Sequence, residues 1–230
     1  MTQNAWNSPN LDANGEVLIG SGSTIPVATT ITGGTNCTVV NGANTVQLTY
    51  TGSTAGDWVL THSASASNST ELTFTGLSST YFVYMIVVDN YVPANDGDRF
   101  YYQTSTDGGS SYDSGSSDYY YQGWEADNGG TVGALDGEFD KSNILGSGTY
   151  QPGNATNESS SAVSYFYNPS ASDYLRSTNF NTTRDDTGET VLLAIHSGRL
   201  QATAVDAIRL FCSGGNITTA EVRIYGRVAS

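Results

Sequence analysis

The sequence predicts an all-β fold: an antiparallel, jelly-roll-like β-sandwich preceded by a short N-terminal interwoven β element. Apolar residues recur at period two or in short blocks broken by Gly, Asn and Ser, and hardly anywhere at the period of a helix. Gly, Ser, Thr, Asn and Tyr are frequent, with 26 Gly and 15 Tyr in 230 residues, a composition typical of turn-rich antiparallel proteins. A chain of this length can bury roughly 70% of its unfolded surface, enough for one sandwich and a small appendage.

Nine segments carry the alternation or the compact apolar block of a β-strand. In chain order they are 58–61, 71–74, 81–89, 99–104, 118–124, 162–167, 190–196, 207–212 and 221–228. Strands at such spacings predict two packed sheets. The polar segment 63–69 predicts a flexible connection, and 107–117 and 127–158 predict long surface loops, where binding residues usually lie.

The last two predicted strands are expected to form a hairpin, because the segment 213–216 between them is short and rich in Gly. Period two places Val222 and Ile224 on one face of the last strand. We expect Ile208 and Leu210 of the preceding strand to share that buried face.

Two Asp-Gly motifs predict tight hairpin turns in which Gly97, Gly108 and Gly109 have a positive φ angle. The second motif, in residues 105–112, also nearly matches the Asp-box of sialidases. That box is itself a hairpin turn, and a propeller would repeat it, whereas it occurs once in this chain. The motif therefore predicts a turn and not a catalytic element.

The first 55 residues differ from the remainder, 56–230, and predict a separate attachment and trimerisation segment. Their apolar elements are very short and are separated by Gly, Ser and Asn. Such pieces cannot bury a core within one chain, so neighbouring chains are expected to supply the other walls. The apolar residues expected at this contact are Leu18, Ile19, Pro26, Val27, Ile31 and Val39.

The charge excludes several classes of partner. Eight basic and 22 acidic residues give a formal net charge of −14, which repels nucleic-acid phosphates and anionic membrane surfaces. No run reaches the ~18 apolar residues of a membrane-spanning helix. The N-terminus has neither the basic stretch nor the apolar region of a secretory signal, so we expect folding in a cytoplasm. No cofactor is predicted.

The N-terminal segment resembles a trimerising β element of phage fibre proteins. The residues that carry the resemblance are 15–22 (GEVLIGSG), 26–28 (PVA), 33–35 (GGT) and 41–42 (NG). In those proteins the element is interwoven between chains. The resemblance covers about 35 residues and implies a homotrimer.

Residues 57–228 resemble a β-sandwich module of virion proteins from environmental phages. The matching segments are 74–77 (FTGL), 81–89, Pro93 with 95–97 (NDG), 105–109 (STDGG) with Tyr112, 207–210 (AIRL), 213–217 (SGGNI) and 223–226 (RIYG). The resemblance implies a virion structural protein, a homotrimeric short fibre or a capsid decoration module on the particle surface. Its expected partners are itself and other capsid or tail proteins, and it is not expected to be an enzyme.

The alternative is a carbohydrate-binding receptor-recognition module of a tail fibre. Tyr and Trp side chains stack on sugar rings and also build rigid protein interfaces. The candidates for a glycan or protein contact are Tyr101, Tyr119, Tyr121 and Trp124. A glycosidase is a more distant alternative.

Reaction and metal chemistry find little support in the sequence. The two histidines, His62 and His196, lack a nucleophile elbow or a zinc-helix motif, so no catalytic residue is predicted. Asp136, Glu138 and Asp140 are a weak calcium candidate, since alternate carboxylates of one loop can converge on an ion. Ordinary solvated turns remain the favoured interpretation of these acidic residues.

Overall fold

The computed structural model describes residues 16–19, 27–30, 37–42, 45–50, 58–147, 151–185 and 187–228. The chain divides into two compact units, Met1–Thr54 and Ala55–Ser230. The described residues form strands, turns and bends and no helix, so the predicted all-β class is confirmed. The described residues therefore contain no helix that could cross a membrane.

The described residues of the first unit form two antiparallel strand pairs. β1 (Glu16–Ile19) pairs with β2 (Val27–Thr30), and β3 (Cys37–Gly42) pairs with β4 (Thr45–Tyr50). In the second hairpin the side chains of Val40 and Leu48 are 52% and 61% exposed. A two-stranded hairpin is marginally stable by itself in water. The attachment and trimerisation role of this unit stays a prediction.

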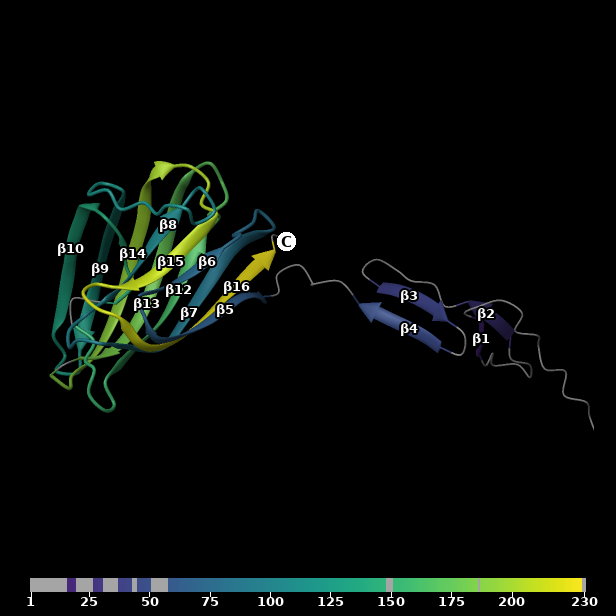
Figure 1. Ribbon diagram of the computed structural model, residues 1–230, viewed down its shortest axis with the longest axis horizontal. Coiled ribbons are helices and arrows are strands. Elements are labelled where there is room, and N and C mark those ends of the chain that lie inside the picture. Colours follow the sequence, from purple (N-terminus) through teal and green to yellow (C-terminus); the bar gives the residue numbers. More distant parts are fainter. Residues whose placement is uncertain are drawn as a thin grey trace, which may run out of the picture. The chain divides into compact units, whose positions relative to one another are not determined.

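The second unit is a sandwich of two antiparallel sheets (Figure 1). Across the eight-stranded sheet the order is β10 (Val132–Lys141), β9 (Tyr119–Asp127), β14 (Thr190–Ala202), β13 (Tyr174–Arg184), β12 (Ser159–Tyr167), β7 (Tyr81–Pro93), β16 (Ile217–Val228) and β5 (Trp58–Ser69). Across the four-stranded sheet the order is β11 (Ile144–Leu145), β8 (Phe100–Ser105), β15 (Ala207–Cys212) and β6 (Glu71–Thr75).

The core lies between the two sheets and follows from alternation along their strands. In β16 every second residue from Ala220 to Gly226 is buried, and Val222 and Ile224 are 1% and 0% exposed. In β15 Ile208 and Leu210 are each 1% exposed. All four belong to one hydrophobic cluster, which confirms the predicted buried face.

The predicted hairpin between the last two strands is wrong. β15 pairs with β6 and β8 in the four-stranded sheet, whereas β16 pairs with β7 and β5 in the eight-stranded sheet. The segment 213–216 therefore crosses from one sheet to the other. The backbone N–H of Ser213 donates to the Arg99 carbonyl, and its hydroxyl donates to Asp98, which ties the crossing to another loop that changes sheets.

The loops at the two Asp-Gly motifs also cross from one sheet to the other. Gly97, Gly108 and Gly109 have φ angles of 82°, 73° and 88°, so the predicted positive φ is confirmed. Their loops, however, join β7 to β8 and β8 to β9, which lie in different sheets. The turns are sheet crossings, and the expectation that they close hairpins is wrong.

Two segments expected to be loops contain strands. Residues 63–69 belong to β5, where Ala66 is buried and Ser65 is exposed, so small residues keep the period-two pattern. Residues 127–158 contain β10 and β11. The loop predicted at 107–117 is confirmed, since it connects β8 to β9.

The inner face of β13 is polar although it is buried. Ser177, Asn179, Asn181 and Thr183 are at most 4% exposed. The Asn179 side-chain amide donates to the carbonyl of Gly146, at 2.6 Å, and to that of Leu145. This polar layer satisfies backbone acceptors at the end of β11 that would be costly to bury unpaired.

Candidate functional site

One face of the eight-stranded sheet turns away from the core, and we call its outward positions on β9, β14, β13, β12, β7, β16 and β5 the open face. Strand register places one apolar row across five of these strands: Trp124, Ala194, Phe180, Val163 and Val87. Trp124 is 63% and Phe180 52% exposed. Contiguous exposed apolar surface of this kind marks an interaction site.

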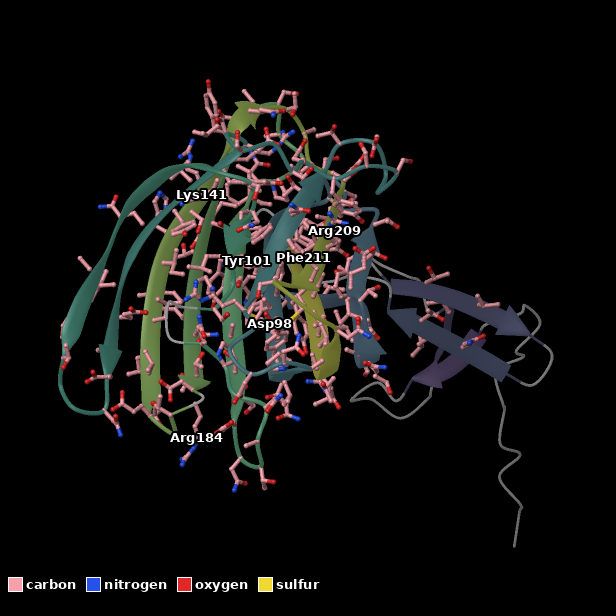
Figure 2. All side chains as sticks on the ribbon, turned by 60° about the vertical axis from the view of Figure 1, so that its left-hand side comes forward. Asp98, Tyr101, Lys141, Arg184, Arg209 and Phe211 are labelled. Carbon is pink, nitrogen blue, oxygen red and sulfur yellow. The ribbon has the colours of Figure 1, made fainter. Side chains whose placement is uncertain are left out.

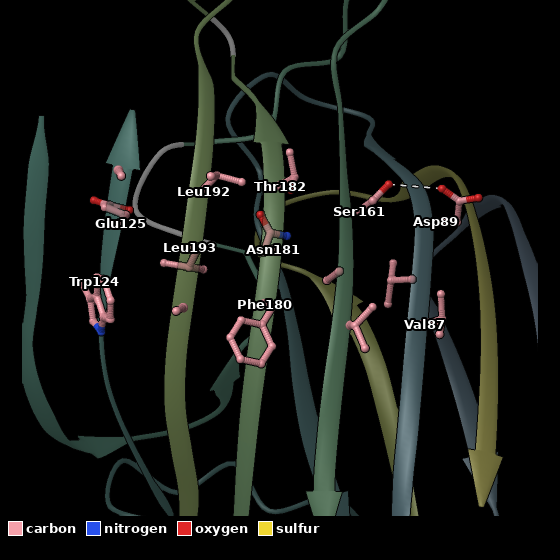
Figure 3. A pocket seen from close by; sticks show the side chains of 15 residues that line it. Val87, Asp89, Trp124, Glu125, Ser161, Phe180, Asn181, Thr182, Leu192 and Leu193 are labelled. Carbon is pink, nitrogen blue, oxygen red and sulfur yellow. Dashed lines mark hydrogen bonds between the residues drawn. The ribbon is translucent and has the colours of Figure 1, made fainter. Parts of the chain in front are cut away.

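A hollow of about 600 Å³ lies on this face (Figure 3). Trp124 stands at one border, Val87 lies at the other, and Phe180 and Leu192 project between them. The polar contact at its edge is the Ser161 hydroxyl, which donates to Asp89 over 3.2 Å. Its lining is mainly aliphatic and aromatic, and its polar members are Asp89, Glu125, Ser161, Asn181 and Thr182. A mainly apolar lining suits an apolar partner surface better than a ligand rich in hydroxyl groups.

The open face becomes aromatic toward the opposite ends of its strands. A second hollow, of about 280 Å³, is bordered by Trp58, Tyr165, Tyr167 and Phe180, with Arg227 beside them. The rings of Tyr165 and Tyr167 stack with their centroids 6.4 Å apart, and Trp58 lies 6.2 Å from Tyr165. Planar rings beside a guanidinium can contact either a protein or a sugar.

The structure does not bring the four predicted aromatic contact residues together. Trp124 lies on the open face, but Tyr119 is 0% exposed, so its assignment as a contact residue is wrong. Its hydroxyl accepts the N–H of Thr104 over 2.9 Å, and burial raises its pKa above the ordinary value of 10.0. Tyr101 and Tyr121 are half-buried against a small cluster formed by Leu145, Leu193 and Ile195.

Tyr101 lies on the outer side of the four-stranded sheet, near Phe211 and Arg209 (Figure 2). Arg209 is the centre of a polar network there, with Gln103 and Glu71 as acceptors. The ring of Tyr101 lies 5.9 Å from that of Phe211, and the Arg209 guanidinium lies 5.2 Å from the Phe211 ring. Arg209 also pairs with Glu71 at 2.9 Å and lies over the ring of Tyr112. These rings already have partners within the chain, so we assign them a structural role.

Sequence reasoning missed Phe180, Val163, Val87 and Leu192 as surface residues. A signal was present: residues 81–88 and 191–195 are continuous apolar blocks instead of alternating ones. Such blocks are typical of strands with apolar side chains on both faces. Only one face of this sheet is covered by the four-stranded sheet.

Most of the remaining predicted site residues lie outside the described parts of the chain. This holds for Pro26 and Ile31, for the side chains of Leu18, Ile19 and Val27, and for the carboxylates of the calcium candidate, Asp136, Glu138 and Asp140. Val39 lies half-buried in β3. Among the side chains that are described, no three His, Cys, Asp or Glu residues gather closely enough to hold a metal ion.

Asp107 organises the loop that follows β8. One of its carboxylate oxygens accepts the Ser105 hydroxyl at 2.7 Å and the Ser111 N–H at 2.9 Å, and the other accepts the Ser111 hydroxyl at 2.6 Å. These hydrogen bonds, those from Ser111 first, lower the pKa of Asp107 from 3.8 to about 2. All of these groups belong to the turn itself, which agrees with a structural role.

We expect Asp107→Ala to lower the melting temperature at pH 6, and the difference from wild type to shrink as the pH falls through about 2. A carboxyl whose pKa is lowered by folding stabilises the native state above its unfolded pKa. That contribution disappears once the native carboxyl is protonated. Thermal melts from pH 6 to pH 2 measure the difference. A difference that stays constant over this range would contradict the assignment.

Comparisons with protein-family models, with curated proteins and with solved structures find no match to this chain. The geometry of the two units is therefore the basis for a functional proposal.

Proposed function

We propose that this chain is a structural protein on the surface of a bacteriophage particle, a homotrimeric short fibre or a capsid decoration module. In this proposal the unit Met1–Thr54 joins the copies and the sandwich is displayed outward. The observation that carries it is the hairpin β3–β4, in which Val40 and Leu48 are more than half exposed. Two strands with exposed apolar side chains gain stability when other chains cover them.

The sequence motifs at 15–42 support the same proposal, because they resemble the trimerising element of phage fibres. The acidic balance of the chain supports a displayed role, since a net charge of −14 keeps assembled particles dispersed. The sandwich has a core of its own within Ala55–Ser230. It therefore does not need the first unit in order to fold.

At low protein concentration we expect the full chain to have the mass of three copies. A chain that begins at Gly56 is expected to have the mass of one copy at that concentration. The reason is that the apolar hairpins lose their covering when the first unit is removed. Light scattering on the two proteins measures this. Leu48→Asp in the full chain is a second test, since a charge at a covered apolar position opposes association. A three-chain mass for both the chain that begins at Gly56 and the Leu48→Asp variant would contradict the proposal.

The particle assignment has its own test. An electron-microscopy map of the intact phage particle is expected to show three-chain density for this protein on the capsid or the tail. If the protein is absent from purified particles, the virion part of the proposal fails, whatever the solution mass.

A second candidate function is recognition of a host glycan by the aromatic end of the open face. The favouring observation is the stacked pair Tyr165 and Tyr167 with Trp58 beside it. A glycan array separates the candidates: a purely structural module binds no glycan selectively. A receptor module binds one, and loses it in Tyr165→Ala.

A further inference from the structure

The charged side chains of the open face are distributed unevenly along the strands. Asp89 and Glu221 are directly opposite each other on β7 and β16, at one end of the face. Arg227, on β16, and Arg176, on β13, lie in a row at the other end, which register connects through Tyr167 and Val83. On β7 and β16 one end of the face is therefore acidic and the other, at Arg227, is basic, with the apolar row between them. The charges on β13 do not follow this gradient, since Arg184 lies at the acidic end and Arg176 pairs with Asp173.

This face is also much less acidic than the rest of the chain. Four outward rows cross the strands from β9 to β5, one at each of the β16 residues 227, 225, 223 and 221. These rows contain three arginines, the third being Arg223, and two carboxylates, Asp89 and Glu221. The chain as a whole has 22 acidic and eight basic residues. Two copies repel each other over most of their surface, and the open face is a place where they can approach without that repulsion.

We propose that the open face binds the same face of a second copy of this chain, with the strands of the two sheets running in opposite directions. A two-fold axis across the strands brings the basic end of one copy over the acidic end of the other. Arg227 of each copy then lies over Glu221 of its partner. Within the chain Glu221 pairs with Arg223 at 2.5 Å, and the partner's Arg227 adds a second cation beside Glu221 and Asp89, which lie directly opposite each other.

The size of the face is sufficient for such a contact. Seven strands about 4.8 Å apart and four rows about 6.8 Å apart give a flat area of about 600 Å². The projecting side chains of Trp124, Phe180 and Leu192 raise the accessible area toward the ~800 Å² per partner of a specific interface. These three side chains are more than half exposed, and the axis that puts Arg227 over Glu221 places Phe180 over the partner's second hollow, beside Thr178.

The pairing is separate from the trimer contact, because a two-fold contact joins chains in twos. In sedimentation velocity on the full chain, we expect the mass to rise from three chains to six as the concentration increases. Phe180→Asp and Leu192→Asp should weaken this doubling about tenfold or more and leave the three-chain mass unchanged. Thr73→Asp is the matched control, since it adds the same charge to an exposed position on β6 in the other sheet.

Charge reversal tests the antiparallel arrangement. Arg227→Glu and Glu221→Arg should each weaken the doubling, and the double variant should restore it, because only this arrangement puts the two positions opposite each other. Circular dichroism checks that each variant is folded. If trimerisation fails but pairing holds, the mass rises from one chain to two. If the mass does not double at any concentration, or the open-face variants double like Thr73→Asp, the pairing is overturned.

Discussion

Asp113→Ala is expected to lower the free energy of unfolding by about 3–5 kcal/mol, because it leaves a buried arginine without its carboxylate. Arg199 is 1% exposed, and its Nε donates to the Asp113 carboxylate over 2.8 Å. The same carboxylate oxygen accepts the Thr104 hydroxyl. The charge of Arg199, without its carboxylate, has to stay in the interior or the local structure has to open.

The matched control is Asp173→Ala, which removes the carboxylate of an exposed ion pair. Arg176 and Asp173 lie 3.4 Å apart, and their side chains are 62% and 61% exposed. Such pairs contribute no more than about 1 kcal/mol. Urea unfolding of the two variants measures both losses. If Asp113→Ala costs no more than Asp173→Ala, the buried pair does not stabilise the sandwich.

The strands that sequence reasoning found are those whose inner face is apolar. In β7 the residues Tyr84, Ile86 and Val88 point into the core at every second position, and the segment was predicted as a strand. β13 was missed because its buried positions are mainly polar, so period two carries no hydrophobic signal. Asn179 and Asn181 are buried because backbone acceptors of Gly146 lie opposite them, and that contact depends on tertiary structure.

Arg199 illustrates the same limit for a single residue. It follows the apolar strand 190–196 and, from sequence alone, would be placed in solvent as a strand-end charge. Its partners are Asp113, 86 residues earlier, and the local Gln201 and Thr203. A contact over 86 residues leaves no periodic pattern in the sequence.

The candidate surface was only partly predictable for a related reason. Trp124 was proposed as a contact residue and lies on the open face. Tyr119, on the same strand, was proposed as well and is buried. Alternation along β9 puts Trp124 and Tyr119 on opposite faces, but the sequence does not say which face another sheet covers. That choice depends on strand order, and the order placed β15 and β16 in different sheets.

Ile224→Ala is expected to cost about 2–5 kcal/mol of unfolding free energy, because the side chain lies at the centre of the core and its removal leaves a cavity. Ile224 is 0% exposed and lies opposite Ile86 of β7 and His62 of β5, so strands hold its position from both sides. Thr218→Ala, on an exposed position of the same strand, should stay within about 0.5 kcal/mol. The two free energies come from urea unfolding at low protein concentration, where chains do not associate through the open face. Equal losses in the two variants would mean that the inner face of β16 is not part of the core that holds the two sheets together.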